Sequence, residues 1–404
     1  MRIAMLVAGL VLAAGALDAA ERPRAREAGV VIGTLATGPL NAIVDVPGVR
    51  VGHATVIEGD SVRTGVTAIL PHGGDLYARR VSAAIHVANG YGKLLGISQV
   101  RELGELETPI LLTCTLCVWE AADALVEWQL ALPGMEQVRS LNAVVGETND
   151  GFLNDIRSRP LRPEHVRAAL ESASTTNVQE GAIGAGTGTV AFGWKGGIGT
   201  SSRKVEAGGT SYTVGVLVQS NYGGTLVVDG VEVGSKLPDP STIAVGDEVP
   251  VAGGDGSIMM VVATDAPLDA RLLERLARRA ITGLARTGTS MSNGSGDYVI
   301  AFSTVTDDAV ARVDNGDMSA LFVAVADATE EAILNSLFKA EGMRGDRGAV
   351  PALPLDLVLP MPPRRRSSTR CSRPKGCVAI AVRCRHCPWT WCCRCCASAT
   401  RRGH

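Results

Sequence analysis

The stretch AGGDGSIMMVVATDAP, residues 252–267, sets a serine after a glycine-rich arm and directly before an unbroken apolar run. Glycine and serine are ordinary turn residues, and the apolar residues 258–263 predict a buried strand. A lone Gly-Ser pair is a weak signal for chemistry. Its position matters here, because Ser257 would be held by a rigid strand while a flexible segment precedes it.

A second serine of this kind follows one strand–helix unit later. Ser295 lies in GTSMSNGSGD, residues 288–297, just before a predicted strand at 297–304. Between the two serines, apolar residues recur at every fourth position and predict a helix. The starts of the two strands are therefore candidates for neighbours at one sheet edge. Asp297 follows Ser295 by two residues, so both side chains share one face of that strand.

The remaining chain alternates predicted strands with a few helices. Strands are predicted within 41–56, 65–74, 81–90, 210–224 and 320–329, a hairpin at 224–234, a strand leading into a helix at 106–132, and helices at 162–174 and 330–341. Strands that come in runs, with helices between them, predict a layered α/β arrangement with mixed or antiparallel sheets.

Composition indicates a globular protein, with 46% hydrophobic and 20% charged residues in 404. The net charge of −2 hides an asymmetry, because the last 44 residues carry eleven Lys and Arg and no acidic residue. The rest of the chain then has a formal charge of −13. An acidic body argues against nucleic-acid binding, which needs a basic face for phosphates.

The two ends of the chain differ from its body. Residues 1–20 have the layout of a secretory signal peptide, which predicts export to the periplasm or the medium; an uncleaved anchor or an ordinary helix is the alternative. No later stretch is apolar enough to predict a membrane span. Residues 21–40 are expected to be a leader, and residues 360–404, rich in Arg and Cys, a disordered tail. A zinc module around Cys384 and Cys387 is the alternative for the tail.

Several other kinds of site find no support in the sequence. The glycine-rich segment 181–202 lacks the spacing of a nucleotide-binding loop, and the six histidines lack metal-ligand spacing. No Gly-x-Ser-x-Gly precedes a helix, as an α/β-hydrolase requires. Cys114 and Cys117 lie in an apolar passage without a second pair in the body, and they are expected to be buried free thiols; a redox pair or half a metal site is the alternative.

Nine stretches of the chain, in order across residues 40–359, resemble the self-processing N-terminal-serine aminopeptidases, the group of L-aminopeptidase D-Ala-esterase/amidases and β-peptidyl aminopeptidases. They are DVPGVRVGHAT, LETPILLT, VVGETNDGFLNDI, GAIGAGTGT, KGGIGTSSR, VQSNYG, GDGSIMMVVATDAPL, ARTGTSMSNGSGD and ALPLDLVL. The resemblance implies an αββα sandwich over 41–359, similar to N-terminal-nucleophile hydrolases but differently connected.

The resemblance also implies that the chain cuts itself between Gly256 and Ser257. The products would be an α subunit, 21–256, and a β subunit, 257–359 onward, assembled as a homotetramer without metal or organic cofactor. The chemistry is physically reasonable, because a serine hydroxyl can attack the preceding carbonyl where a glycine tolerates the bend. The α-amino group that is released has an ordinary pKa of about 8 and can take the hydroxyl proton.

Site residues follow from the same resemblance. Ser257 is the expected nucleophile, with Ser295 and Asp297 as its hydrogen-bonding partners. Some relatives carry Glu at the carboxylate position, and the shorter Asp changes its reach. Asn221 matches an amide that stabilises the oxyanion. Asn149 stands where some members have an aromatic hydroxyl, and it is expected to contact the substrate or the oxyanion.

The sequence thus predicts an aminopeptidase or amidase that releases L-, D- or β-amino acids from short peptides, amides or esters. Two alternatives stay open at this point. One is an acyltransferase of the related fold, although such enzymes use threonine as the new N-terminus. The other is an uncleaved binding protein without catalytic activity.

Overall fold

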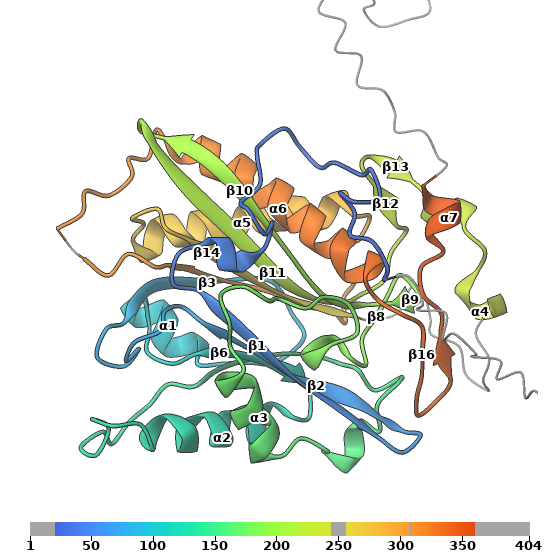
Figure 1. Cartoon of the computed structure of the whole chain (residues 1–404), viewed down its shortest axis with the longest axis horizontal. Helices are drawn as coiled ribbons and strands as arrows, with labels where there is room; N and C mark the ends of the chain where they lie inside the picture. Colours follow the sequence, from blue (N-terminus) through green and yellow to red (C-terminus); the bar gives the residue numbers. More distant parts are fainter. Residues whose placement is uncertain (1–20, 244–255, 308, 360–404) are drawn as a thin grey trace, which may run out of the picture. The chain divides into compact units, whose positions relative to one another are not determined.

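Two β-sheets lie face to face in the structure, and helices cover both outer faces (Figure 1). This computed structural model describes residues 21–243, 256–307 and 309–359. The predicted signal peptide and the predicted tail lie outside these residues. Within the described ranges, no helix is both long and apolar enough to cross a membrane.

The first sheet has five strands in the order β1-β2-β6-β7-β4. Their bounds are β1 Arg50–Glu58, β2 Val62–Leu70, β4 Leu94–Leu95, β6 Ile110–Cys114 and β7 Val144–Thr148. β6 and β7 are parallel, and the other neighbours are antiparallel. The carboxyl ends of β6 and β7 therefore lie at the same edge of this sheet.

The second sheet has six strands in the order β10-β11-β14-β15-β3-β5. Their bounds are β3 Val81–Gly90, β5 Glu105–Leu106, β10 Gly197–Ala207, β11 Thr210–Asn221, β14 Ser257–Thr264 and β15 Gly296–Ser303. β14 and β15 are parallel, and the other pairs are antiparallel. The parallel pairing confirms that the two strand starts are neighbours, because Ser257 lies across from Gly296.

Two pairs of helices complete the layers (Figure 1). α5 (Ala270–Arg286) and α6 (Met318–Phe338) pack on the six-stranded sheet, and α2 (Val118–Leu130) and α3 (Pro163–Glu171) pack on the five-stranded sheet. Three apolar clusters fill the spaces between helices and sheets and between the two sheets. This layering confirms the expected αββα sandwich.

α5 forms where the four-residue apolar period predicted a helix. Leu272, Leu276 and Leu284 are buried on its sheet-facing side. Asp269 caps its start, because the carboxylate accepts a hydrogen bond from the Leu272 N–H at 2.8 Å. This helix also supplies the crossover that parallel neighbours such as β14 and β15 need.

The strand predicted at 320–329 is wrong. These residues form the first half of α6, which continues without a break to Phe338. The run is apolar almost throughout, and α6 is buried on nearly all sides in its second half. Periodicity cannot separate a buried helix from a buried strand in such a run. The length of the combined segment decides in favour of the helix.

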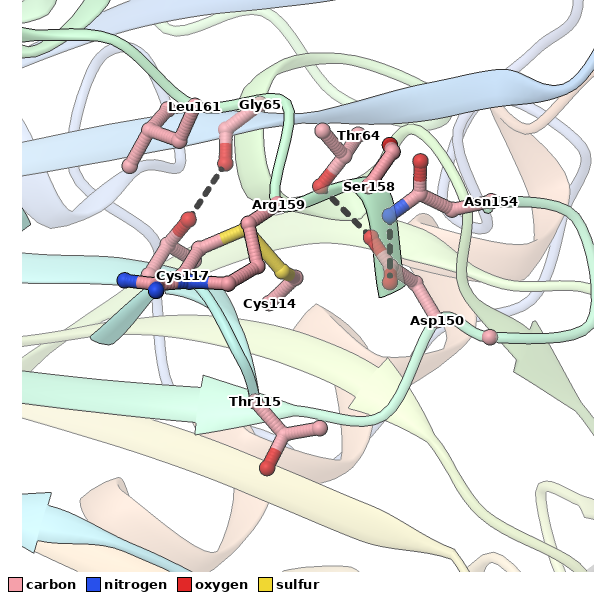
Figure 2. Close-up of a disulfide and its surroundings, with 12 residues drawn as sticks. Thr64, Gly65, Cys114, Thr115, Cys117, Asp150, Asn154, Ser158, Arg159 and Leu161 are labelled. Atoms are coloured by element: carbon pink, nitrogen blue, oxygen red, sulfur yellow. Dashed lines mark hydrogen bonds between the residues drawn. A yellow bond between two sulfur atoms is a disulfide. The ribbon is translucent and has the colours of Figure 1, made fainter. Parts of the chain in front are cut away.

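The expectation of free thiols at Cys114 and Cys117 is also wrong, because the two residues form a disulfide (Figure 2). Cys114 ends β6, and Cys117 precedes α2 after a turn in which its N–H donates to the Cys114 carbonyl at 3.0 Å. This turn brings the two Cα atoms to 5.0 Å, within the range a disulfide requires. Both residues are buried.

The smaller elements connect these layers. They are η1 Ile43–Asp45, α1 Ile97–Leu103, η2 Ile156–Ser158, η3 Gly184–Gly186, β8 Val190–Ala191, β9 Trp194–Lys195, β12 Val227–Val228, β13 Val231–Glu232, η4 Gly234–Lys236, α4 Pro240–Ile243, β16 Met343–Arg344, β17 Ala349–Val350 and α7 Leu355–Val358, where η marks a 3-10 helix. β12 and β13 form the predicted hairpin through Asp229 and Gly230, both with positive φ. Upstream, Arg22 donates to the Phe338 carbonyl at 2.8 Å, so the leader contacts the end of α6.

Candidate active site

Ser257 occupies the first position of β14, between two strands that each supply a predicted site residue. Asn221, the last residue of β11, lies directly across from it in the antiparallel register. Gly296, the first residue of β15, lies across from it on the other side. Only 6% of the Ser257 surface is exposed. The register therefore brings Asn221 and Gly296, which are 75 positions apart in sequence, to the two sides of the buried Ser257.

Ser295 and Asp297 form a hydrogen-bonded pair at the start of β15, the strand next to Ser257. The Ser295 hydroxyl donates to Asp297 Oδ1 at 2.7 Å, and both side chains are buried. Among the described residues, Asp297 Oδ2 has no hydrogen-bond partner. Burial raises the pKa of Asp297 to about 6, although the Ser295 hydrogen bond acts in the opposite direction. The carboxyl can therefore gain or lose a proton near neutral pH.

The amide of Asn221 has a single consistent orientation. Its Oδ1 accepts from the Val190 N–H at 2.9 Å, and its Nδ2 donates to the Asn149 carbonyl at 3.0 Å. A backbone N–H can only donate and a carbonyl can only accept, so a flipped amide would lose both bonds. One N–H of the amide is used by Asn149, which leaves the second available as a donor.

Asn149 reaches the site through its backbone. Its side-chain Oδ1 accepts from the Gly151 N–H at 3.0 Å in an exposed turn. Its carbonyl is the group that meets Asn221. The structure therefore places the main chain of this residue, and not its side-chain amide, against the predicted oxyanion donor.

Gly256 is held closely by its surroundings. Its carbonyl accepts a hydrogen bond from the Gly296 N–H at 3.0 Å. A Cβ at this position would lie 2.6 Å from the Asn221 carbonyl oxygen and would also overlap the Tyr222 backbone. Close packing therefore favours a residue without a side chain at this position.

A second buried carboxylate lies near this site, in the ETNDG stretch from which the sequence prediction singled out Asn149 and not Glu147. Glu147, near the end of β7, is 2% exposed, and its Oε1 accepts from the Lys93 N–H at 2.8 Å. A Cβ on Gly92 would lie 3.1 Å from this oxygen and 3.4 Å from the Gly296 Cα, so Glu147 is close to the start of β15. Burial is the main effect on the pKa of Glu147 and raises it. Glu147 comes from the facing sheet, which no local pattern in the sequence could indicate.

Comparison with known proteins identifies the family. The model of peptidase family S58 matches residues 41–350, which is most of the chain. The chain belongs to peptidase family S58. The expected family is confirmed, as is the expected enzyme class, a hydrolase of the aminopeptidase type.

Individual S58 relatives cover most of this chain. A β-peptidyl aminopeptidase BapA of Sphingosinicella microcystinivorans is 40% identical over 86% of this chain and 93% of its own. The BapA of Sphingosinicella xenopeptidilytica is 41% identical over 85% and 92%. Both relatives therefore align with the body of the chain, including the strands that carry Ser257, Asn221 and Asp297.

Solved structures of relatives have the same fold. A β-aminopeptidase of a Burkholderia species superposes with a TM-score of 0.76 at 40% identity, covering 84% of this chain and 98% of its own. The L-aminopeptidase D-Ala-esterase/amidase of Ochrobactrum anthropi superposes with a TM-score of 0.75 at 38% identity, covering 83% and 97%. The latter is described as a variant of the N-terminal-nucleophile hydrolase fold. The S58 fold is therefore shared across the described core.

Proposed function

We propose that this S58 peptidase is activated by cutting its own chain between Gly256 and Ser257. The observation that carries the proposal is the position of Ser257 at the start of β14, between Asn221 and Gly296. A serine that becomes the first residue of its chain gains an α-amino group next to its hydroxyl. Such an amine serves as the general base in enzymes of this kind.

In the cutting step, the Ser257 hydroxyl oxygen attacks the Gly256 carbonyl carbon. The Gly256–Ser257 C–N bond breaks as the Ser257 nitrogen takes up a proton, which leaves Gly256 as an ester on the serine. Water then hydrolyses the ester into a Gly256 carboxylate and a free serine. The Gly296 N–H, 3.0 Å from the Gly256 carbonyl oxygen, supports this step because it is oriented to stabilise negative charge on that oxygen.

In the proposed turnover, the Ser257 amine takes the hydroxyl proton while the oxygen attacks the substrate carbonyl. The free N–H of Asn221 stabilises the oxyanion, and the Ser295–Asp297 pair hydrogen-bonds the nucleophile. Glu147 supplies a negative charge for the ammonium group at the substrate's N-terminus. The bond to the leaving amine or alcohol then breaks as the Ser257 ammonium returns the proton to it, and water hydrolyses the acyl-enzyme to release the amino acid. Short peptides, amides or esters with an L-, D- or β-amino acid at the N-terminus fit this scheme.

The mature form that we propose has two subunits from one precursor. The zymogen loses residues 1–20 on export, and the cut then yields an α subunit, 21–256, and a β subunit, 257–359 onward. Four such protomers form a homotetramer in the periplasm or the medium. The proposal leaves residues 360–404 without a part in catalysis.

The experiment compares wild type with Ser257→Ala on a denaturing gel and by intact mass. We expect two wild-type fragments divided at Gly256/Ser257 and one uncut chain in the variant, which has no hydroxyl to attack. Only the cut protein should hydrolyse L-, D- and β-alanyl p-nitroanilides. A wild-type chain that stays whole after long incubation would instead support a binding protein without enzymatic activity.

A further inference from the structure

Lys195 in β9 is a cation without any exposure to solvent. Its ammonium group donates to the carbonyls of Gly186 at 2.9 Å, Thr189 at 2.9 Å and Gly196 at 2.8 Å. An ammonium has three N–H donors, so all of them are used. Burial lowers the pKa of Lys195, and the attraction of Asp150 opposes this shift. Such a group is costly to bury, and the three carbonyls explain how the fold tolerates it.

The three carbonyls belong to one loop, residues 186–196, and this loop holds Asn221. The Val190 N–H, within the loop, is the donor that fixes the Asn221 Oδ1 at 2.9 Å. Ala191, Phe192 and Trp194 of this loop are buried in the core, β8 pairs with β9, and the Gly196 N–H donates to the Thr189 carbonyl at 3.1 Å. The Lys195 ammonium adds the contact that ties both ends of the loop, Gly186 and Gly196, to Thr189, the residue before Val190.

Asp150 is next in sequence to the residue that binds the Nδ2 side of the Asn221 amide, as Lys195 belongs to the loop that binds its Oδ1 side. It directly follows Asn149, whose carbonyl accepts from Asn221 Nδ2. Figure 2 shows its carboxylate between Thr64 and Asn154, which donate at 2.6 Å and 3.1 Å. Asp150 also packs on the loop, because a Cβ on Gly188 would lie 2.9 Å from the Asp150 Cβ.

We propose that Lys195 and Asp150 are positioning residues that hold the Asn221 amide in the orientation needed for the oxyanion. The two segments that fix this amide, at Val190 and at Asn149, are each anchored by one of the two buried charges. A rotation of the amide by 180° would turn an oxygen toward the developing oxyanion and replace attraction with repulsion. The inference rests on the proposed role of Asn221.

The test is a double-mutant cycle of Lys195→Met with Asn221→Ala, with kcat and KM measured per cut chain. Removing an oxyanion donor typically lowers kcat about 10²–10³-fold, so we expect Asn221→Ala to act in this range. Lys195→Met alone should lower kcat about tenfold or more and leave KM within about twofold. In the Asn221→Ala background the same change should cost less than about twofold, because the group it positions is gone.

Two further variants separate positioning from stability. Arg203→Lys changes another fully buried cation. Arg203 pairs with Glu331 at a distance of 2.6 Å, and this pair lies away from the site. Arg203→Lys should lower the melting temperature and leave kcat unchanged. Asp150→Asn keeps the size of the side chain, removes its charge and turns one of its two acceptor oxygens into a donor, so it tests the same prediction if Lys195→Met does not fold. Hydrogen exchange in a peptide that contains Val190 should become faster in both Lys195→Met and Asp150→Asn.

The outcomes distinguish the two proposals. Equal losses of kcat for Lys195→Met with and without Asn221 would overturn the positioning role alone. A folded Lys195→Met that keeps kcat within twofold of wild type, or one that stays uncut although Asn221→Ala is cut, would overturn it as well. An Asn221→Ala enzyme with wild-type kcat would contradict the proposed role of Asn221 and the positioning role with it.

Discussion

At the scale of the residue, Asp297 shows how burial sets the conditions for chemistry. Its carboxyl has one hydrogen bond, from Ser295, and one oxygen without a partner among the described residues. Its pKa is raised to about 6, well above the ordinary value of about 4 for aspartate. The raised value means that the folded protein binds this proton more tightly than the unfolded chain does.

Acidification should therefore have opposite effects on turnover and on stability. Turnover should slow as the pH falls through about 6, by up to tenfold per unit, because Asp297 loses its charge. The stability that Asp297 contributes is present below pH 4 and is lost as the pH rises from about 4 to about 6. The measurement is the hydrolysis of an alanyl p-nitroanilide by the cut protein between pH 5 and 8.

The control for this prediction is Ser295→Ala. The Ser295 hydrogen bond lowers the pKa of Asp297, so its removal should move the midpoint of the pH profile upward. A flat profile between pH 5 and 7, or a midpoint that moves downward in Ser295→Ala, would contradict the assignment of this titration to Asp297.

At the scale of the element, the success of sequence prediction depended on whether the signal was local. β3 has the predicted bounds, and α5 and the 224–234 hairpin form where periodicity and the Asp-Gly turn indicated them. The neighbouring strand starts, now seen as the pairing of Ser257 with Gly296, were predictable because a single strand–helix unit separates them in sequence. Glu147 and the Asn149 carbonyl could not be predicted, because they reach the site from the facing sheet. The prediction for the first half of α6 was wrong for a different reason, because its apolar run has no period that separates a helix from a strand.

The turn between β6 and α2 gives a prediction at the same scale. The Cys114–Cys117 disulfide closes a very short loop, and short loops restrict the unfolded chain least. Replacing both cysteines by alanine should lower the free energy of unfolding by about 2 kcal/mol or less. The measurement is urea unfolding in the Ser257→Ala background, where the chain stays in one piece. A reductant should destabilise the parent protein and leave the cysteine-free variant unchanged.

At the scale of the whole molecule, the two proposed subunits interleave within one sheet. β14 and β15 come from the β subunit, and their outer neighbours, β11 and β3, both come from the α subunit. The β subunit also supplies α5 and α6, which cover the strands of both subunits. Neither piece contains the complete six-stranded sheet, so the chain must fold before it is cut.

This arrangement predicts a difference in refolding. Uncut Ser257→Ala should recover its native circular dichroism after dilution from urea, with a rate independent of protein concentration. Cut wild type should recover more slowly and less completely, with a rate that rises with concentration, because two chains must meet. Equal, concentration-independent recovery of both proteins would show that the pieces fold on their own.

The strand pair inserted between β11 and β3 thus has a consequence for how long the enzyme lasts. Before the cut, an unfolded molecule can return to its native state by itself. After the proposed cut, each opening of the sheet would risk the permanent loss of the partner chain, so the mature enzyme would not readily reassemble. Its working life would then be governed by the rate at which it unfolds and not by an equilibrium between folded and unfolded states.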